Sequence, residues 1–199
     1  MPAEARVTTI WKQQKLFIGI FLIGFGLWFF ADGKWFWPKS NERWLEHERL
    51  EKEKRMDEWP GIAKSRGWKT QPPEKYHDQE AIFMQLLIAT LLAATGAIAI
   101  LYWVSHKGRI VKTDAEAVYS PGGTRVPFEA ITGLGVKKWE SKGYATVRYE
   151  IDGRKGEFVL DDYKFDRDPT HAIFNEIKER LELRAKGTGG ELLPPPATE

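Results

Sequence analysis

The stretch from residue 81 to residue 104 constrains this chain more than any other. It reads AIFMQLLIATLLAATGAIAILYWV, which is 24 residues without a single charge. At about 1.5 Å of rise per residue such a helix is roughly 36 Å long, enough to cross a hydrocarbon core of about 30 Å. A buried helix of a soluble protein rarely stays apolar on every face for this length. We therefore predict a transmembrane helix here.

A second apolar segment lies nearer the N-terminus, at residues 16–31, and reads LFIGIFLIGFGLWFFA. Its 16 residues correspond to about 24 Å of helix, which is short for a membrane span. A positive start followed by an apolar run is also typical of a signal peptide, but no small-residue cleavage site follows it. We therefore favour an uncleaved span, preceded by a polar N-terminal tail at residues 1–15.

Two spans would form an antiparallel pair, and small residues mark where their backbones can approach closely. Alanines recur every four residues in the second segment and glycines occur in the first, although both residue types are also simply common in membrane helices. The residues that we expect in this contact are Ala89, Ala93, Gly96, Ala97, Gly19 and Gly24, with Gly26 beside them. The pattern does not distinguish a contact between the two spans from a contact with another chain.

Neither span contains Asp, Glu, Lys, Arg or His. Transport paths, proton relays and voltage sensors need such groups within the membrane, and a haem ligand there is usually a histidine. The polar side chains in the apolar cores are Gln85, Thr90 and Thr95, which we expect to hydrogen-bond to a neighbouring helix or to their own backbone. The sequence therefore disfavours a transporter or a cofactor carrier, and we expect no cofactor.

Aromatic residues flank both apolar segments. The chain has nine tryptophans, and most lie close to a predicted span, as expected for residues that anchor at the level of the lipid headgroups. The interfacial anchors that we expect are Trp11, Trp35, Trp37, Tyr102 and Trp103.

Residues 32–80 join the two spans and contain one predicted helix, at about residues 40–58. Ser40 can cap its start, and the WPG sequence at residues 59–61 is expected to end it. Its apolar stripe is thin, so two interpretations stay open: a helix that docks on a partner or lies on the membrane, and a solvated, charge-rich helix. The candidate docking residues on one side of it are Trp44, Leu45, Met56 and Trp59, with Leu50 off this side.

From about Gly108 the hydropathy pattern changes to a period of two, which is typical of strands that bury one face. One amphipathic helix follows the strands, with Asp168 as its N-cap and Pro169 in the first position. Beyond it, residues 187–199 are expected to form a flexible tail. The six short strands that we expect lie at residues 109–113, 117–120, 124–127, 131–139, 144–151 and 155–161.

Two stretches of this domain carry a resemblance to a known family. They read VYSPGGTRVPFEAITGL at residues 118–134 and YATVRYEIDGRKGEFVLDDYKF at residues 144–165, and the helix follows them. Together they resemble a bacterial pleckstrin-homology-like domain, which implies a sheet or open barrel of seven antiparallel strands plugged by a C-terminal helix. Members of that family are often attached to membrane helices and resemble modules for lipid-surface or protein contact rather than enzymes.

One turn of this domain is a candidate contact site. Basic residues beside an aromatic residue can meet anionic lipid headgroups, whereas an ordinary solvated loop has the same composition. The residues concerned are Lys137, Lys138, Trp139 and Lys142. We read the acidic residues around position 161 as strand-end and capping residues, so we expect no metal site, and the spacing shows no catalytic constellation.

The fold class that we expect is a two-helix transmembrane hairpin plus a small α+β domain at residues 106–186, the latter a pleckstrin-homology-like antiparallel sheet with a C-terminal helix. The net charge of +2 is too balanced for nucleic-acid binding. The chain has no cysteine, which removes disulfides, thiolate metal sites and cysteine nucleophiles.

We therefore expect a non-enzymatic accessory or scaffold subunit of a larger bacterial membrane protein complex. The alternative is a membrane-anchored lipid-surface or signalling module that uses the basic turn. The expected partners are other integral membrane proteins and the lipid bilayer, with no nucleic acid and no identified small-molecule substrate. We expect the bacterial inner membrane, with both termini on one side. The distribution of Lys and Arg hardly favours either side, and the cytoplasm is the commoner location for such a domain.

Overall fold

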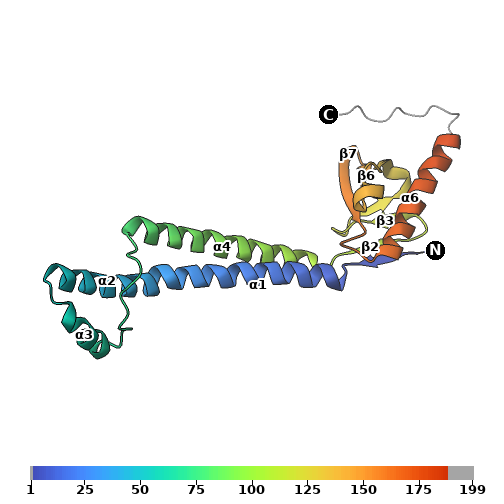
Figure 1. Cartoon of the computed structure of the whole chain (residues 1–199). Coiled ribbons are helices and arrows are strands. Elements are labelled where there is room, and N and C mark those ends of the chain that lie inside the picture. Colours follow the sequence, from blue (N-terminus) through green and yellow to red (C-terminus); the bar gives the residue numbers. More distant parts are fainter. Residues whose placement is uncertain (1, 188–199) are drawn as a thin grey trace. The chain divides into compact units, whose positions relative to one another are not determined.

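The computed structural model describes residues 2–187, so the expected flexible tail lies outside the described residues except for Gly187. The chain forms two compact units. One is helical and comprises residues 15–102, and the other combines the residues up to 14 with those from 103 onward. Figure 1 labels the main elements along the chain.

The first helix runs without interruption from Thr9 to Lys52. It comprises α1 (Thr9–Ala31), a π-helical turn η1 (Asp32–Phe36) and α2 (Trp37–Lys52). The sequence instead suggested a separate second helix starting at Ser40. The π-helical turn explains the continuity: the amide of Trp37 donates to the carbonyl of Asp32, and this wider turn accommodates Pro38 at the start of α2.

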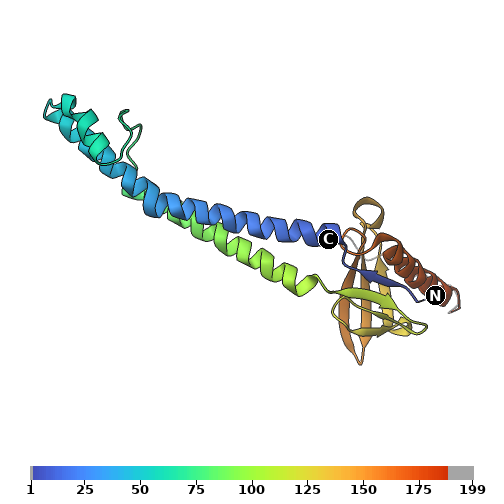
Figure 2. The ribbon, with the colours of Figure 1, turned by 90° about the horizontal axis from the view of Figure 1, so that it is seen from below.

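The second long helix, α4 (Gln79–His106), runs beside α1 in both views (Figures 1 and 2). Its start is capped as expected, because the Asp78 carboxylate accepts a hydrogen bond of 2.7 Å from the amide of Ala81. Both long helices are long and apolar enough to cross a membrane.

The end of the first long helix and the residues that follow it form a small folded structure that we call the helical cap, residues 37–77. After α2 it contains the 3₁₀ turn η2 (Met56–Glu58) and α3 (Trp59–Ser65). The WPG sequence thus begins a helix instead of ending one. Pro60 lies in the first turn of α3, where the backbone N–H that proline lacks would have no hydrogen-bond partner within the helix. Gly67 follows α3 with a φ of +68°, a conformation typical of a helix C-terminus.

The other unit contains two antiparallel sheets. The four-stranded sheet has the order β1-β2-β3-β4, and the three-stranded sheet has the order β5-β6-β7. The strands are β1 (Glu4–Arg6), β2 (Ile110–Thr113), β3 (Ala117–Tyr119), β4 (Arg125–Pro127), β5 (Ile131–Gly135), β6 (Tyr144–Ile151) and β7 (Arg154–Asp161). The helical elements are the 3₁₀ turn η3 (Phe128–Ala130), the short α5 (Trp139–Lys142) and α6 (Arg167–Gly187).

The N-terminal residues are a strand of this unit, where the sequence suggested a tail. β1 pairs with β2, and Ala5 lies opposite Val111. Both side chains are fully buried, and Val7 makes an isolated bridge to Phe165. Within residues 2–187 the unit therefore has seven strands, one more than the six expected from the sequence.

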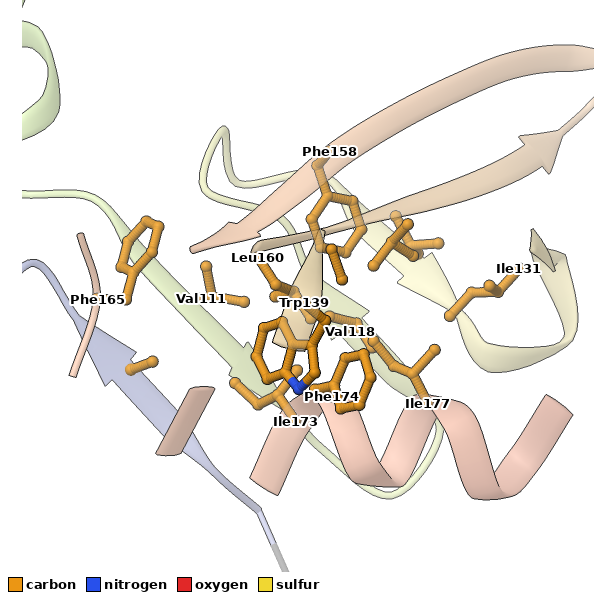
Figure 3. Packing of buried hydrophobic residues seen from close by; sticks show 14 of the residues in the cluster. Val111, Val118, Ile131, Trp139, Phe158, Leu160, Phe165, Ile173, Phe174 and Ile177 are labelled. Carbon is orange, nitrogen blue, oxygen red and sulfur yellow. The ribbon is translucent and has the colours of Figure 1, made fainter. Parts of the chain in front are cut away.

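One hydrophobic core joins the two sheets and α6 (Figure 3). The expected alternation in β6 is present, with Ala145 and Val147 fully buried. In α6 the expected apolar stripe is also buried, including Ile173 and Ile177. The helix begins at Arg167, so Asp168 lies in its first turn and is not the N-cap.

Candidate functional site

The contact between α1 and α4 is built on glycines. A Cβ atom on Gly96 would lie 2.7 Å from Ile23 Cγ1 and 2.9 Å from the carbonyl oxygen of Gly19. A Cβ atom on Gly26 would lie 2.9 Å from the carbonyl oxygen of Ala89. Real Cβ atoms do not approach backbone atoms so closely. The two backbones therefore touch at these positions, as expected for close helix packing through small residues.

The glycines in contact with α4 recur every seven residues, at Gly19, Gly26 and Gly33. A seven-residue repeat keeps one face of a helix against its neighbour when the two helices wind around each other. Gly24 breaks this repeat, and nothing lies within 4 Å of a Cβ atom placed there.

Of the residues predicted for this contact, four lie in it and two do not. Gly19, Ala89, Ala93 and Gly96 take part. Gly24 and Ala97 face away from the contact, and Ala97 is exposed. Contact with another chain stays a prediction for these two residues, whereas between α1 and α4 the seven-residue repeat decides which small residues meet. That repeat also identifies Gly33.

The polar residues of α4 behave in two ways. The hydroxyls of Thr90 and Thr95 donate to carbonyls one turn earlier in their own helix, at 2.9 and 2.8 Å. Gln85 is buried against the other helix, where its Nε2 donates to Asp32 Oδ2 at 3.4 Å. This polar contact lies near the end of the apolar pair, so it helps to fix the helix register.

The faces of α1 and α4 that point away from this contact are apolar and exposed. On α1, Phe17, Phe21 and Phe25 form a ladder with ring centroids 5.8 and 4.7 Å apart, and each is about half exposed or more. On α4, Ile98 and Leu101 are more than two thirds exposed. Apolar surface of this extent marks a contact with lipid or with another protein.

The predicted interfacial aromatic residues divide into two groups. Trp35 and Tyr102 are exposed, and the ring of Trp37 stacks on His77 at 4.0 Å. Trp11 is only 4% exposed and belongs to the core of the β-sheet unit, against which Trp103 also packs. The interpretation of Trp11 as a membrane anchor is therefore wrong, because an amphipathic tryptophan suits a protein core as well as a headgroup layer.

The helical cap has a hydrophobic core of its own. It consists of Leu50, Trp59 and Ala63, with Met56 packed against it. Trp59 and Met56 therefore stabilise the cap and do not form an outward docking stripe. Leu50, which lay off the predicted stripe, is fully buried, because α3 folds back on α2 and the buried face is set by that contact.

The other two candidate docking residues lie nearer the surface of the cap. Leu45 is 51% exposed, and Trp44 contacts the ring of Tyr76 at 5.1 Å. These two residues stay candidates for contact with a partner.

An extended segment, residues 66–77, returns from α3 to α4 and is held against the cap. Asn41 binds the backbone of His77 twice: its Nδ2 donates to the carbonyl at 2.5 Å, and its Oδ1 accepts from the amide at 2.8 Å. Trp59 Nε1 donates to the carbonyl of Thr70 at 2.6 Å, and Arg43 Nη2 donates to the carbonyl of Gln71. Burial lowers the pKa of His77, and the charge of Lys75 acts in the same direction.

The basic turn of the β-sheet unit keeps only part of its predicted character. Lys137, Lys138 and Lys142 are exposed, as a surface contact requires. Trp139 is 9% exposed and stacks on Phe174 with centroids 4.0 Å apart and planes 8° apart (Figure 3). The prediction that Trp139 contacts headgroups is therefore wrong, because its ring fills the core beside α6.

The turn itself is held in a fixed conformation by Gly143, which has a φ of +72°. A Cβ atom there would overlap the carboxylate of Asp162, which also pairs with His171 at 2.9 Å. Between residues 2 and 187, no group of three or more His, Cys, Asp or Glu side chains is placed to hold a metal ion.

Comparisons with protein-family models, with curated proteins and with solved structures find no match for this chain.

Proposed function

We propose that this protein is a non-enzymatic accessory or scaffold subunit of a larger bacterial membrane protein complex. Its two long helices would lie in the inner membrane, and the β-sheet unit and the helical cap would cover partner surfaces on the two sides of the bilayer. The observation that carries the proposal is the exposed apolar face of the helix pair, of which the ladder of Phe17, Phe21 and Phe25 is the clearest part. This face offers side chains for packing and no ionisable group for chemistry.

The pairing of β1 with β2 supports a two-span topology. These strands precede and follow the helix pair in the chain, yet they are neighbours in one sheet. A single sheet cannot lie on both sides of a bilayer, so both long helices or neither must cross it. The proposal therefore has both ends of the chain on one side, which we take to be the cytoplasm.

The proposal also treats the β-sheet unit as a pleckstrin-homology-like domain. Two antiparallel sheets with seven strands in total, followed by a C-terminal helix that packs on their core, support this proposal. In such a domain the helix pair and the cap would be an insertion between the first and second strands. A domain of this kind would serve as a contact module.

Purification from the native membrane in a gentle detergent tests the scaffold function. The tagged chain should bring a stoichiometric set of membrane proteins with it, detected by mass spectrometry. The variant F21A/F25A, which removes two exposed rings from the ladder, should lower their recovery about tenfold. The control F21L/F25L keeps the face apolar and should retain most of the partners.

Two results would count against the scaffold function. One is a chain that comes alone or only with copies of itself. The other is a set of partners recovered equally by all three proteins.

A second function is favoured by one observation at the basic turn. Val136 is 48% exposed and is followed directly by the exposed Lys137 and Lys138, with the exposed Lys142 at the end of α5, so the turn presents both an apolar side chain and cations to the surface. This combination suits contact with an anionic lipid surface, which is the alternative of a lipid or signalling module.

A single fluorescent label tests this alternative, because the chain has no cysteine of its own. The variant V136C carries an environment-sensitive dye, and the full chain is placed in nanodiscs. Its emission should shift to the blue with anionic lipid relative to neutral lipid, and K137E/K138E/K142E should abolish the shift, because the lysines supply the attraction. The same emission wavelength in anionic and in neutral nanodiscs would contradict the hypothesis of a lipid or signalling module.

A further inference from the structure

The helical cap contains a polar crevice of about 430 Å³ that the proposed function does not use. Two elements form it: the first turns of α2 and the extended segment that returns to α4. The residues that line it are Ser40, Arg43, Lys69, Gln71, Pro72, Glu74, Lys75 and His77.

The crevice is held open by contacts that do not depend on a ligand. The double hydrogen bond between Asn41 and the backbone of His77 closes one end, and the stacked ring of Trp37 supports it. The bond from Arg43 to the carbonyl of Gln71 and the bond from Trp59 to the carbonyl of Thr70 hold the earlier part of the same extended segment. A site shaped in advance loses less conformational entropy when it binds.

The lining of the crevice is positively charged. It contains three cations, Arg43, Lys69 and Lys75, against the single carboxylate of Glu74. Within residues 2–187, none of these three cations has a carboxylate oxygen within 4.0 Å. Other cations of the cap do have such a partner, for example Lys52, which pairs with Glu48 at 2.9 Å. The positive charge of the crevice is therefore available to an anion.

Arg43 is the most constrained of these cations. One guanidinium nitrogen donates to a backbone carbonyl, and Nε is enclosed without a hydrogen-bond partner. Guanidinium groups present several donors and are suited to phosphate oxygens.

We propose that this crevice binds a phosphate oxyanion through Arg43, Lys69 and Lys75. Two sources offer this chemistry, the headgroup of an anionic phospholipid and free phosphate. His77 precedes the apolar segment 81–104 by four residues, which is at most about 14 Å of chain. In the membrane placement proposed above, this distance brings the crevice beside the headgroup layer, so the phospholipid is the favoured source.

The test compares the full chain with two double variants. K69Q/K75Q removes two of the crevice cations and keeps Arg43, whose bond to Gln71 shapes the site. The control, K52Q/K64Q, removes the same charge from exposed positions of the cap that do not line the crevice. Circular dichroism checks that all three proteins keep their helices.

Binding is measured in two ways. Native mass spectrometry of the detergent-purified protein records how much phosphatidylglycerol it retains relative to phosphatidylcholine. Calorimetry in neutral nanodiscs records the affinity for inorganic phosphate. K69Q/K75Q should lower either the retention of phosphatidylglycerol or the affinity for inorganic phosphate by about tenfold or more. The reason is that each lysine near a lipid phosphate contributes about 1 kcal/mol. The control should stay within about twofold of the wild type.

Each outcome decides the matter. A selective loss of phosphatidylglycerol identifies the lipid as the source, and a selective loss of inorganic phosphate identifies the free ion. Equal binding by all three proteins, or equal loss in both variants, overturns the proposal. Neither result depends on whether partner subunits are recovered, so failure of the scaffold function would be seen separately.

Discussion

Gly96→Leu should separate α1 from α4. The new side chain would meet Gly19 and Ile23 at the point where the two backbones touch, and backbone atoms cannot move aside without displacing a whole helix. We expect a loss of about 3 kcal/mol in the free energy of unfolding, at the upper end of overpacking effects. Unfolding of the full chain by titration with sodium dodecyl sulfate, followed by circular dichroism, measures this loss.

Gly24→Leu is the matched control for this experiment. It introduces the same side chain on α1, at a position where nothing lies within 4 Å of the new Cβ atom. Its effect should stay within about 0.5 kcal/mol of the wild type, as for other exposed positions. Equal destabilisation by the two variants would show that the helices do not pack through the glycine face.

Ala5→Glu should unfold the β-sheet unit. Ala5 is fully buried in β1, opposite Val111, so the substitution places a carboxylate in the hydrophobic core without a partner. Destabilisation of this kind typically exceeds about 4 kcal/mol, a large part of the stability of a small domain. Near-ultraviolet circular dichroism should lose the signal of the ordered core, while the helical signal of α1 and α4 remains.

Glu4→Gln tests the same strand at its exposed position. The side chain of Glu4 is 43% exposed and pairs with the mostly exposed Arg6, so its loss should change the unfolding temperature very little. If Ala5→Glu is as harmless as Glu4→Gln, β1 is not part of the folded unit.

The tertiary position of the tryptophans shows where inference from the sequence ends. The sequence context of three tryptophans is typical of interfacial or contact residues, but all three are buried: Trp11, Trp59 and Trp139. A tryptophan beside an apolar segment fits a headgroup layer and a protein core equally well, because the ring is apolar and its nitrogen can find one hydrogen-bond partner in either place. Only the folded arrangement distinguishes the two.

The glycines of α1 also show what the sequence could not predict, namely which individual glycines contact α4. The sequence indicated that small residues would lie between the helices, and Gly19 and Gly96 do. It did not separate Gly24 from Gly26, which are two positions apart on the same helix. That choice depends on how the second helix winds around the first, which a single helix does not encode.

The sequence by itself determined the elements whose pattern is local and long. These are the two apolar helices, the alternating strands β6 and β7, and the amphipathic helix α6, because ten or more residues contribute to each pattern or hairpin. The tertiary structure alone decided that residues 4–6 form β1, the strand that the sequence did not predict. A strand of three residues has no periodicity to detect, and β1 exists because β2, more than a hundred residues later in the chain, supplies its hydrogen-bond partners.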